Sequence, residues 1–89
     1  MRLDKFLKVS RIIKRRSVAK EISDQGRILI NDRTAKSSSN VAVNDKLVIK
    51  FGNKTLTIRV DALLETTKKD EAEQMYTILS EDYEKDYRQ

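Results

Sequence analysis

The fold is decided by residues 2–30, RLDKFLKVSRIIKRRSVAKEISDQGRILI. Apolar or small side chains recur in its first half at the spacing of one helix face, namely Leu3, Phe6, Leu7, Ser10 and Ile13. A helix with this spacing buries that face against a core. Ile12 is also apolar but lies off the stripe, so the pattern predicts that the helix breaks between Ser10 and Ile13.

A second helix is predicted over residues 17–25, with Val18, Ala19 and Ile22 facing inward. Gly26 follows directly and is a typical stop signal, because glycine accepts the left-handed backbone of a helix C-terminal cap. The next residues, 27–30, are rich in β-formers and predict a short strand. Asn31 and Asp32 after it tolerate positive φ, which predicts a tight turn.

The middle of the chain predicts a small antiparallel sheet. Residues 33–36 are predicted to form a second short strand, and the serine-rich stretch 37–40 is predicted to be a loop. Residues 46–51 and 55–60 flank a short glycine-containing loop, which is typical of a hairpin. Apolar and polar residues alternate over 55–60, so one face is buried and the other faces water. The fold class is α+β, with two N-terminal helices packed on a mostly antiparallel sheet.

The composition changes after residue 60, where acidic residues become frequent. Residues 69–80 carry four apolar side chains at helical spacing and predict a third amphipathic helix; these are Ala72, Met75, Tyr76 and Leu79. Residues 81–89 have no apolar stripe, which predicts a frayed tail. We therefore divide the chain into a domain over residues 1–64 and an acidic helix with its tail over residues 65–89.

The composition excludes several functions. The 89 residues suffice for one small domain and include neither cysteine nor histidine, so disulfides, thiolate metal sites and the commonest general base are missing. With only Gly26 and Gly52, the chain has no glycine-rich phosphate loop. The first ten residues lack the apolar core of a signal peptide, and no apolar run approaches the roughly 20 residues of a membrane span. We expect a cytoplasmic binding protein, not an enzyme, without cofactor, metal or membrane partner.

Charge is distributed unevenly along the chain. Residues 1–36 hold 11 Lys and Arg against 4 Asp and Glu, residues 37–60 hold 4 against 1, and residues 61–89 hold 4 against 9. The net charges are therefore +7, +3 and −5, which gives the overall +5. A basic end whose cations cluster around structured elements predicts a polyanionic partner.

The residue types narrow the partner to a nucleic acid read through its backbone. Phe6 and Phe51 are expected in the core, and the three tyrosines lie in the acidic third of the chain. Few aromatic side chains are therefore available for stacking on bases, which favours structured RNA, or DNA contacted through phosphates. Asp4 is the one acid set among bases. It serves as a helix N-terminal charge, as an ion-pair partner of Arg2 or Lys8, or as a residue that orients an arginine toward RNA.

Several stretches together resemble the RNA-binding domain named after ribosomal protein S-four. The similarity covers about residues 1–52 and is carried by RLDKFL at 2–7, SRIIKRRSVA at 10–19, Gly26, Arg27, Ile28, Ile30, Asn31, Lys36, Ser38, Val41, Asp45, Lys46 and Leu47. The resemblance implies the αL type of RNA-binding fold, in which a helix pair on a small curved sheet binds ribosomal RNA or transfer RNA.

Within this family, the short length and the opening RLDKFL are most similar to stand-alone members, the heat-shock-fifteen type and the RqcP type. The RqcP type implies a monomeric, ribosome-associated factor of quality control. By this resemblance, we expect the protein to contact rRNA and P-site peptidyl-tRNA on obstructed large subunits and to support alanine tailing beside the factor RqcH. Two alternatives stay open: recycling of aborted subunits or their assembly, and a protein-interaction module whose partner surface is the helix over 69–80.

The resemblance also implies which residues bind RNA. Arg2, Asp4 and Lys5 match the family's opening, and Lys14 and Arg16 match its basic turn, with Arg2 and Arg16 the strongest candidates. Weaker candidates are Lys8, Arg11, Arg15, Arg33 and Lys36. Arg15 stands where the family has a capping Ser or Thr. Either the cap is lost, at about 0.5–2 kcal/mol, or Ser17 caps a shorter helix.

Overall fold

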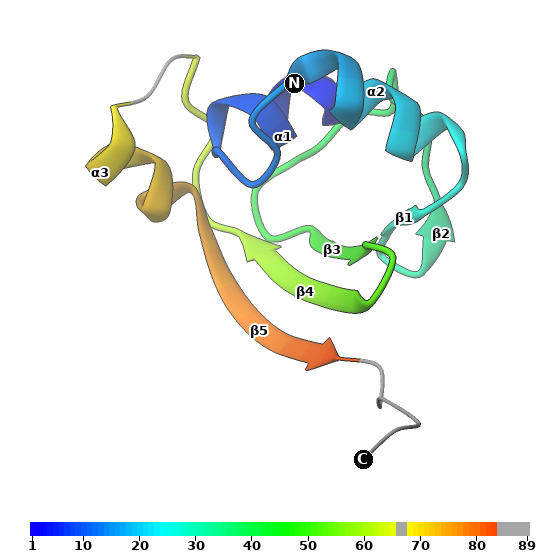
Figure 1. Cartoon of the computed structure of the whole chain (residues 1–89). Coiled ribbons are helices and arrows are strands. Elements are labelled where there is room, and N and C mark those ends of the chain that lie inside the picture. Colours follow the sequence, from blue (N-terminus) through cyan, green and yellow to red (C-terminus); the bar gives the residue numbers. More distant parts are fainter. Residues whose placement is uncertain (66–67, 84–89) are drawn as a thin grey trace.

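A computed structural model of the chain describes residues 1–65 and 68–83 and has two layers. Two N-terminal helices lie on one face of a five-stranded antiparallel sheet whose strand order is β2-β1-β3-β4-β5 (Figure 1). The elements are α1 (Leu3–Val9), α2 (Arg16–Asp24), β1 (Ile28–Ile30), β2 (Arg33–Thr34), β3 (Lys46–Lys50), β4 (Lys54–Val60), α3 (Lys69–Ala72), a short 3-10 helix η1 (Glu73–Met75) and β5 (Tyr76–Tyr83). The predicted α+β class is confirmed.

Helix α1 buries the predicted stripe and breaks where the pattern indicated. Leu3, Phe6 and Leu7 are fully buried in the core. The helix ends at Val9, and two residues later Arg11 adopts a φ of 63°. This left-handed backbone costs a non-glycine residue roughly 1–2 kcal/mol. It turns the chain sharply and starts the connection to α2.

Helix α2 faces the core through small side chains. Ala19 and Ser23 are fully buried, and the Ser23 hydroxyl donates a hydrogen bond to the Ala19 carbonyl at 2.7 Å. Residues four apart share one helix face, and small side chains there let a helix approach its neighbour closely. Val18 is adjacent to Ala19 and therefore points about 100° away, where it is 38% exposed. The prediction that Val18 faces inward was wrong, whereas Ile22 does pack against the core.

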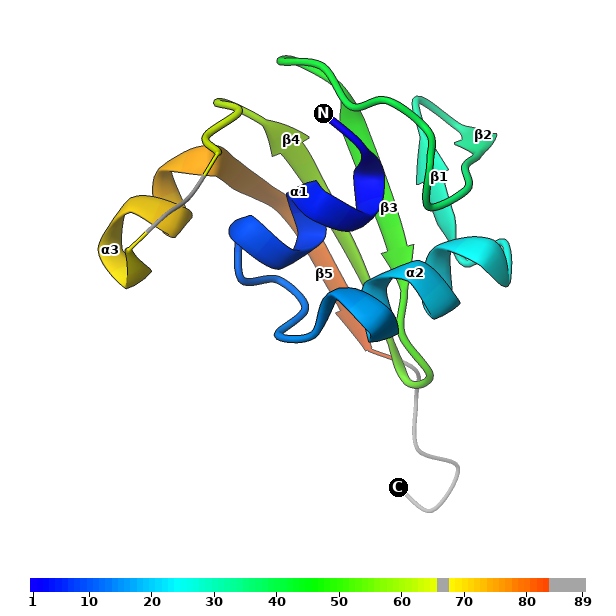
Figure 2. The ribbon, with the colours of Figure 1, turned by 90° about the horizontal axis from the view of Figure 1, so that it is seen from above.

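The sheet supplies the other half of the core, as the alternation predicted. Leu56, Ile58 and Val60 of β4 are buried, and Leu47 and Ile49 of β3 lie opposite Ile58 and Leu56 in the antiparallel register. These side chains share one face of the sheet, and α1 and α2 lie over this part of it (Figure 2). Apolar side chains buried to this degree contribute roughly 1.5–3 kcal/mol each.

The C-terminal segment differs from the prediction of one helix over residues 69–80. The helix stops at Ala72, η1 follows, and the chain then becomes the edge strand β5. The predicted stripe therefore holds only as far as Met75, which is fully buried, while Leu79 is 50% exposed. Of the predicted tail, residues 81–83 belong to β5, and residues 84–89 lie outside the described residues.

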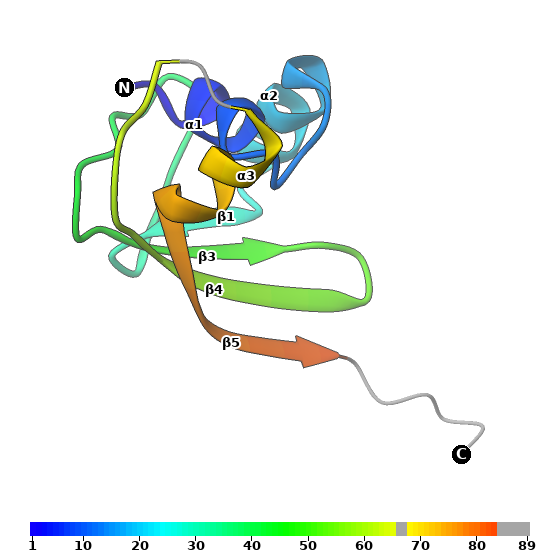
Figure 3. The same cartoon turned by 90° about the vertical axis from the view of Figure 1, so that its left-hand side faces the viewer.

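The reason for this strand lies in β4. Its free edge would present unpaired backbone groups, and β5 satisfies them over pairs from Val60–Tyr76 to Lys54–Tyr83. Backbone hydrogen bonding along a strand therefore outweighs the helical periodicity. The consequence is that α3 is held beside the end of α1, at one side of the molecule (Figures 1 and 3).

Alanine substitutions at Gly26 and Gly52 test whether the turn that ends α2 requires glycine, with Gly52 as the control. Gly26 has a φ of +77°, and an added Cβ would meet nothing closer than 3.6 Å, so only backbone strain opposes alanine there. Gly26→Ala should lower the free energy of unfolding by about 1–2 kcal/mol in chemical denaturation. Gly52 has neither positive φ nor a neighbour within 4 Å, so Gly52→Ala should not destabilise. Equal effects of the two changes would contradict the assignment.

Candidate nucleic-acid interface

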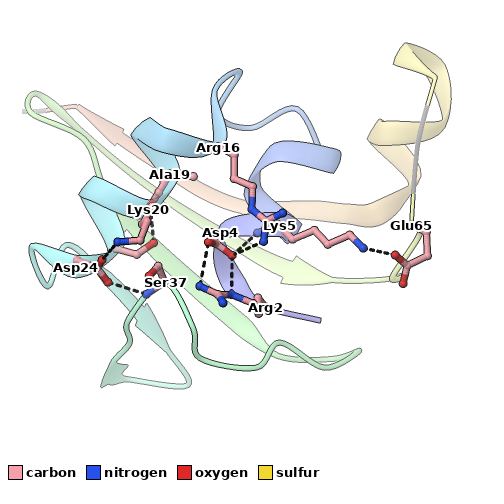
Figure 4. A network of polar contacts seen from close by, with 10 residues as sticks. Arg2, Asp4, Lys5, Arg16, Ala19, Lys20, Asp24, Ser37 and Glu65 are labelled. Atoms are coloured by element: carbon pink, nitrogen blue, oxygen red, sulfur yellow. Dashed lines mark hydrogen bonds and ion pairs between the residues drawn. The ribbon is translucent and has the colours of Figure 1, made fainter.

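Two arginines meet on one buried carboxylate at the start of the helix pair. Arg2 reaches Asp4 through Nε and Nη2, both at 3.3 Å, and Arg16 reaches the same carboxylate through Nη2 at 3.4 Å (Figure 4). The Asp4 side chain is only 4% exposed, whereas those of Arg2 and Arg16 are 49% and 50% exposed. We call Arg2 and Arg16 the arginine pair. Asp4 orients the pair, and both arginine side chains stay half exposed to solvent.

Backbone contacts set the position of Arg2. No side chain caps α1, but the backbone N–H groups of Leu3 and Asp4 donate to the carbonyls of Ser39 and Ser37 at 2.8 and 3.2 Å. The loop after β2 therefore satisfies donors that every helix leaves free at its first turn. This loop is itself held by α2, because the Ser37 N–H donates to the Asp24 carboxylate at 3.0 Å. That hydrogen bond also lowers the pKa of Asp24.

Arg16 occupies the first turn of α2. The helix begins at Arg16, its N-cap residue is Arg15, and no side chain forms a hydrogen bond at the cap. Ser17 lies inside the helix, so the alternative of a shorter helix capped by Ser17 was wrong. The first turn also contains no acidic residue. Its partial positive charge is therefore not offset there, and it adds to the attraction of Arg16 for an anion.

Lys5 points away from the arginine pair and forms an ion pair with Glu65 (Figure 4). The hydrogen bond from Lys5, and then its charge, lower the pKa of Glu65. Lys5 thus links α1 to the segment that follows β4. Lys5 is a predicted RNA contact, but the carboxylate of Glu65 already balances its charge.

Three further predicted cations line a groove between the α1–α2 turn and the C-terminal segment. The groove has a volume of about 470 Å³ and is lined by Lys8, Ser10, Arg11, Lys14, Lys69, Ala72, Glu73 and Tyr76. The first four come from α1 and its turn, and the last four from α3, η1 and the start of β5. Lys69 and Tyr76 were not predicted as site residues, because only the tertiary fold brings them to the basic turn. We call this hollow the α3 groove.

The other predicted cations lie elsewhere. Arg15 is exposed next to Arg16 at the start of α2. Arg33 lines a second, polar hollow of about 570 Å³ beside β1 and β2, and Lys36 is exposed where the following loop begins. Neither residue joins the arginine pair or the α3 groove. RNA contact by the ten predicted residues stays a prediction.

Residues 1–65 and 68–83 contain no group of three or more acidic, histidine or cysteine side chains placed to hold a metal ion. In the same part of the chain, no helix has the length and apolar character required to cross a bilayer. The chemistry available at the arginine pair and the groove is ion pairing and hydrogen bonding to anions. Guanidinium groups suit this purpose because their planar donors match two phosphate oxygens at once.

Comparison with known proteins defines the class. The family model described as the S4 domain matches residues 1–47, which span α1, α2, β1, β2 and the start of β3. This is the family that the opening RLDKFL and the basic turn resembled.

Relatives narrow the class further. The chain is 61% identical to the RQC P-site tRNA stabilizing factor of Bacillus subtilis, over 92% of this chain and 95% of that protein. It is 34% identical to heat shock protein 15 of Escherichia coli, over 96% of this chain and 65% of that protein. The trimeric structure of Vibrio cholerae heat shock protein 15 matches with a TM-score of 0.83 at 28% identity, covering 90% of this chain and 82% of that one. The protein therefore belongs to the S4 domain family, in the branch of the RQC P-site tRNA stabilizing factors.

Asp4→Asn tests whether the buried carboxylate orients the arginine pair. The amide has nearly the same shape but no charge, so both guanidinium groups lose their ionic anchor. We expect the free energy of unfolding to fall by about 1–3 kcal/mol, because one buried partner of charged hydrogen bonds changes. We also expect weaker RNA binding at a temperature where the variant stays folded.

Asp32→Asn is the matched control for that change. Asp32 also pairs with a cation, Lys46, at 3.0 Å, but its side chain is 76% exposed. An exposed ion pair contributes little, so stability should change by less than about 1 kcal/mol and RNA binding should not weaken. A folded Asp4→Asn variant that binds RNA as the wild type does would show that the arginine pair needs no anchor.

Proposed function

We propose that the protein is a non-catalytic, ribosome-associated factor that stabilises P-site tRNA on large ribosomal subunits during quality control. The observation that carries the proposal is the arginine pair, two half-exposed arginine side chains whose guanidinium groups contact one buried carboxylate. Support for the task comes from the relatives, because the Bacillus subtilis protein with 61% identity is an RQC P-site tRNA stabilizing factor. Binding is the whole activity in this proposal.

The geometry suits a folded RNA. Each guanidinium carries five N–H donors, and Arg2 directs two of its nitrogens and Arg16 one toward Asp4. Donors therefore remain for phosphate oxygens. Because Asp4 and the packed helices fix both side chains, less conformational entropy is lost when RNA binds. A rigid cationic surface of this kind reads the shape and backbone of structured RNA.

The partners follow from this role. We propose that the helix pair contacts both rRNA of the large subunit and the P-site tRNA, and that the protein acts as a monomer in the cytoplasm. The alanine-tailing factor RqcH would work on the same obstructed subunits. The surface charge is consistent with two RNA partners, because the arginine pair lies at the starts of α1 and α2 and the α3 groove adds cations from the end of α1 and the turn after it.

Arg16→Ala and Arg59→Ala form a matched pair for testing this function. Both arginines are about half exposed and each pairs with one aspartate, but Arg59 belongs to β4 and its side chain is exposed between the buried Ile58 and Val60. Arg16→Ala should weaken co-sedimentation with large subunits about tenfold, whereas Arg59→Ala should leave it unchanged. Arg59→Ala should lose less than about 1 kcal/mol of stability. Arg16→Ala removes one of the two cationic partners of the buried Asp4 and should lose about 1–3 kcal/mol, so binding is compared at a temperature where both variants stay folded.

The salt dependence of the same measurement separates RNA from protein as the partner. Affinity that depends on several phosphate contacts falls by orders of magnitude between about 50 and 200 mM salt, and Arg16→Ala should lower the slope by about one. Affinity that does not change with salt would contradict the proposal and favour a protein-interaction module. Equal losses for the two arginine variants would contradict a specific role of the arginine pair.

Recycling of aborted large subunits is the second candidate function, and the structural similarity to heat shock protein 15 favours it. Isolating the tagged protein with its bound particles distinguishes the two. For quality control we expect RqcH and alanine-tailed chains on the recovered subunits. Recovery of subunits without RqcH and without tailed chains would support recycling instead, and immature subunits would indicate assembly.

A further inference from the structure

The α3 groove lies outside what the S4 domain accounts for. One of its walls belongs to α1 and the turn after it, but the other is made of residues beyond position 47, where the family match ends. We propose that this groove binds one unstacked RNA nucleotide, with the phosphate on the lysines and the base against Tyr76. The inference rests on the proposed function and names a further element of the RNA that the protein recognises.

The charge of the groove fits a phosphate. Four cations, Lys8, Arg11, Lys14 and Lys69, line it together with a single carboxylate, Glu73. Within the described ranges, Lys8, Lys14 and Lys69 form no ion pair with a carboxylate. A phosphate diester carries one negative charge and is attracted to such a group of cations. Glu73 repels the phosphate, so in this proposal the three lysines hold the phosphate and the base lies toward Glu73 and Tyr76.

Tyr76 provides the surface for the base. It is the first residue of β5, is paired with Val60, packs against the core and is among the residues that line the groove, so its position is fixed by the fold. Burial, and then the charge of Glu73, raise the pKa of Tyr76. The phenol therefore stays neutral at physiological pH and does not repel the phosphate. A rigid, neutral ring beside cations is the usual platform for stacking an unpaired base.

Size and position select a single nucleotide. A volume of about 470 Å³ is in the range of small-ligand sites, roughly 300–1,000 Å³, and is far too small for a duplex. Unpaired nucleotides in loops, bulges and ends of RNA can turn out of the stack and enter such a site. Lys14 in the groove is two residues before Arg16. One RNA can therefore contact the groove and the arginine pair together, which favours RNA over an acidic peptide as the occupant.

The experiment measures the affinity of the full chain for large subunits that carry P-site tRNA. Lys69→Ala should weaken binding about threefold or more and lower the salt slope by about one. Tyr76→Leu removes the stacking surface and should weaken binding at least severalfold, whereas Tyr76→Phe keeps the ring and should bind as the wild type does. Lys50→Ala is the charge-matched control, since Lys50 ends β3 on the side away from α3 (Figure 1).

Folding is controlled separately because Tyr76 also packs against the core. If Tyr76→Leu does not fold, 4-thiouridine-labelled RNA is crosslinked to wild-type protein in the same complex, and the adducts are located by mass spectrometry. An adduct at Tyr76 supports the proposal, and adducts confined to other residues overturn it. The proposal is also overturned if Lys69→Ala binds as tightly as the wild type. It is overturned as well if Lys69→Ala binds more weakly but a folded Tyr76→Leu variant binds normally.

The outcomes separate this inference from the proposed function. If Arg16→Ala weakens subunit binding while Lys69→Ala does not, the groove proposal fails and the proposed function stands. If Arg16→Ala has no effect, the proposed function fails first. Competition by an acidic peptide but not by RNA would show that the groove binds a protein instead.

Discussion

The interaction on which the surface depends is the contact of two arginines with one buried carboxylate. Asp4 is nearly inaccessible to solvent, and both Arg2 and Arg16 reach it from half-exposed positions. A carboxylate buried in this way would be costly without ionic partners, so the protein itself requires both guanidinium groups to be there. The same contact holds both arginine side chains where they stay half exposed to solvent. Stability of the helix pair and presentation of cations to RNA therefore come from one arrangement.

The rest of the fold supports that arrangement. The loop after β2 donates carbonyls to the start of α1, and α2 holds the same loop through Asp24. Beneath them, β3 and β4 supply the apolar face on which both helices pack. The helices alone are too short to be stable in water, because isolated helices of fewer than about 12 residues are marginal. Their geometry is thus imposed by the sheet and the loop.

Much of this could be predicted from the residues. The stripe from Leu3 to Ile13, the stop at Gly26 and the alternation in β4 all report local periodicity, and the structure confirms each of them. Predictions failed where a local pattern competed with a distant partner. Val18 was predicted to be buried, but α2 turns the face with the small side chains of Ala19 and Ser23 to the core, which leaves Val18 partly exposed. Tyr76 and Leu79 fit a helical pattern, but residues 76–83 pair with the open edge of β4 as a strand, with Leu79 at the register shift in that pairing.

The sequence by itself determined the fold class, the basic end of the chain and the candidates Arg2 and Arg16, because spacing, charge and motif are properties of neighbouring residues. Only the tertiary structure decided that Asp4 joins these two arginines and that Lys69 and Tyr76 lie beside Lys8 and Lys14. The reason is physical: the contacts of the groove join residues up to 68 positions apart, from Lys8 to Tyr76. They form only when β5 pairs with β4 and places α3 beside α1. A local sequence pattern does not indicate which distant segment will form hydrogen bonds with the unpaired backbone groups at the edge of a strand.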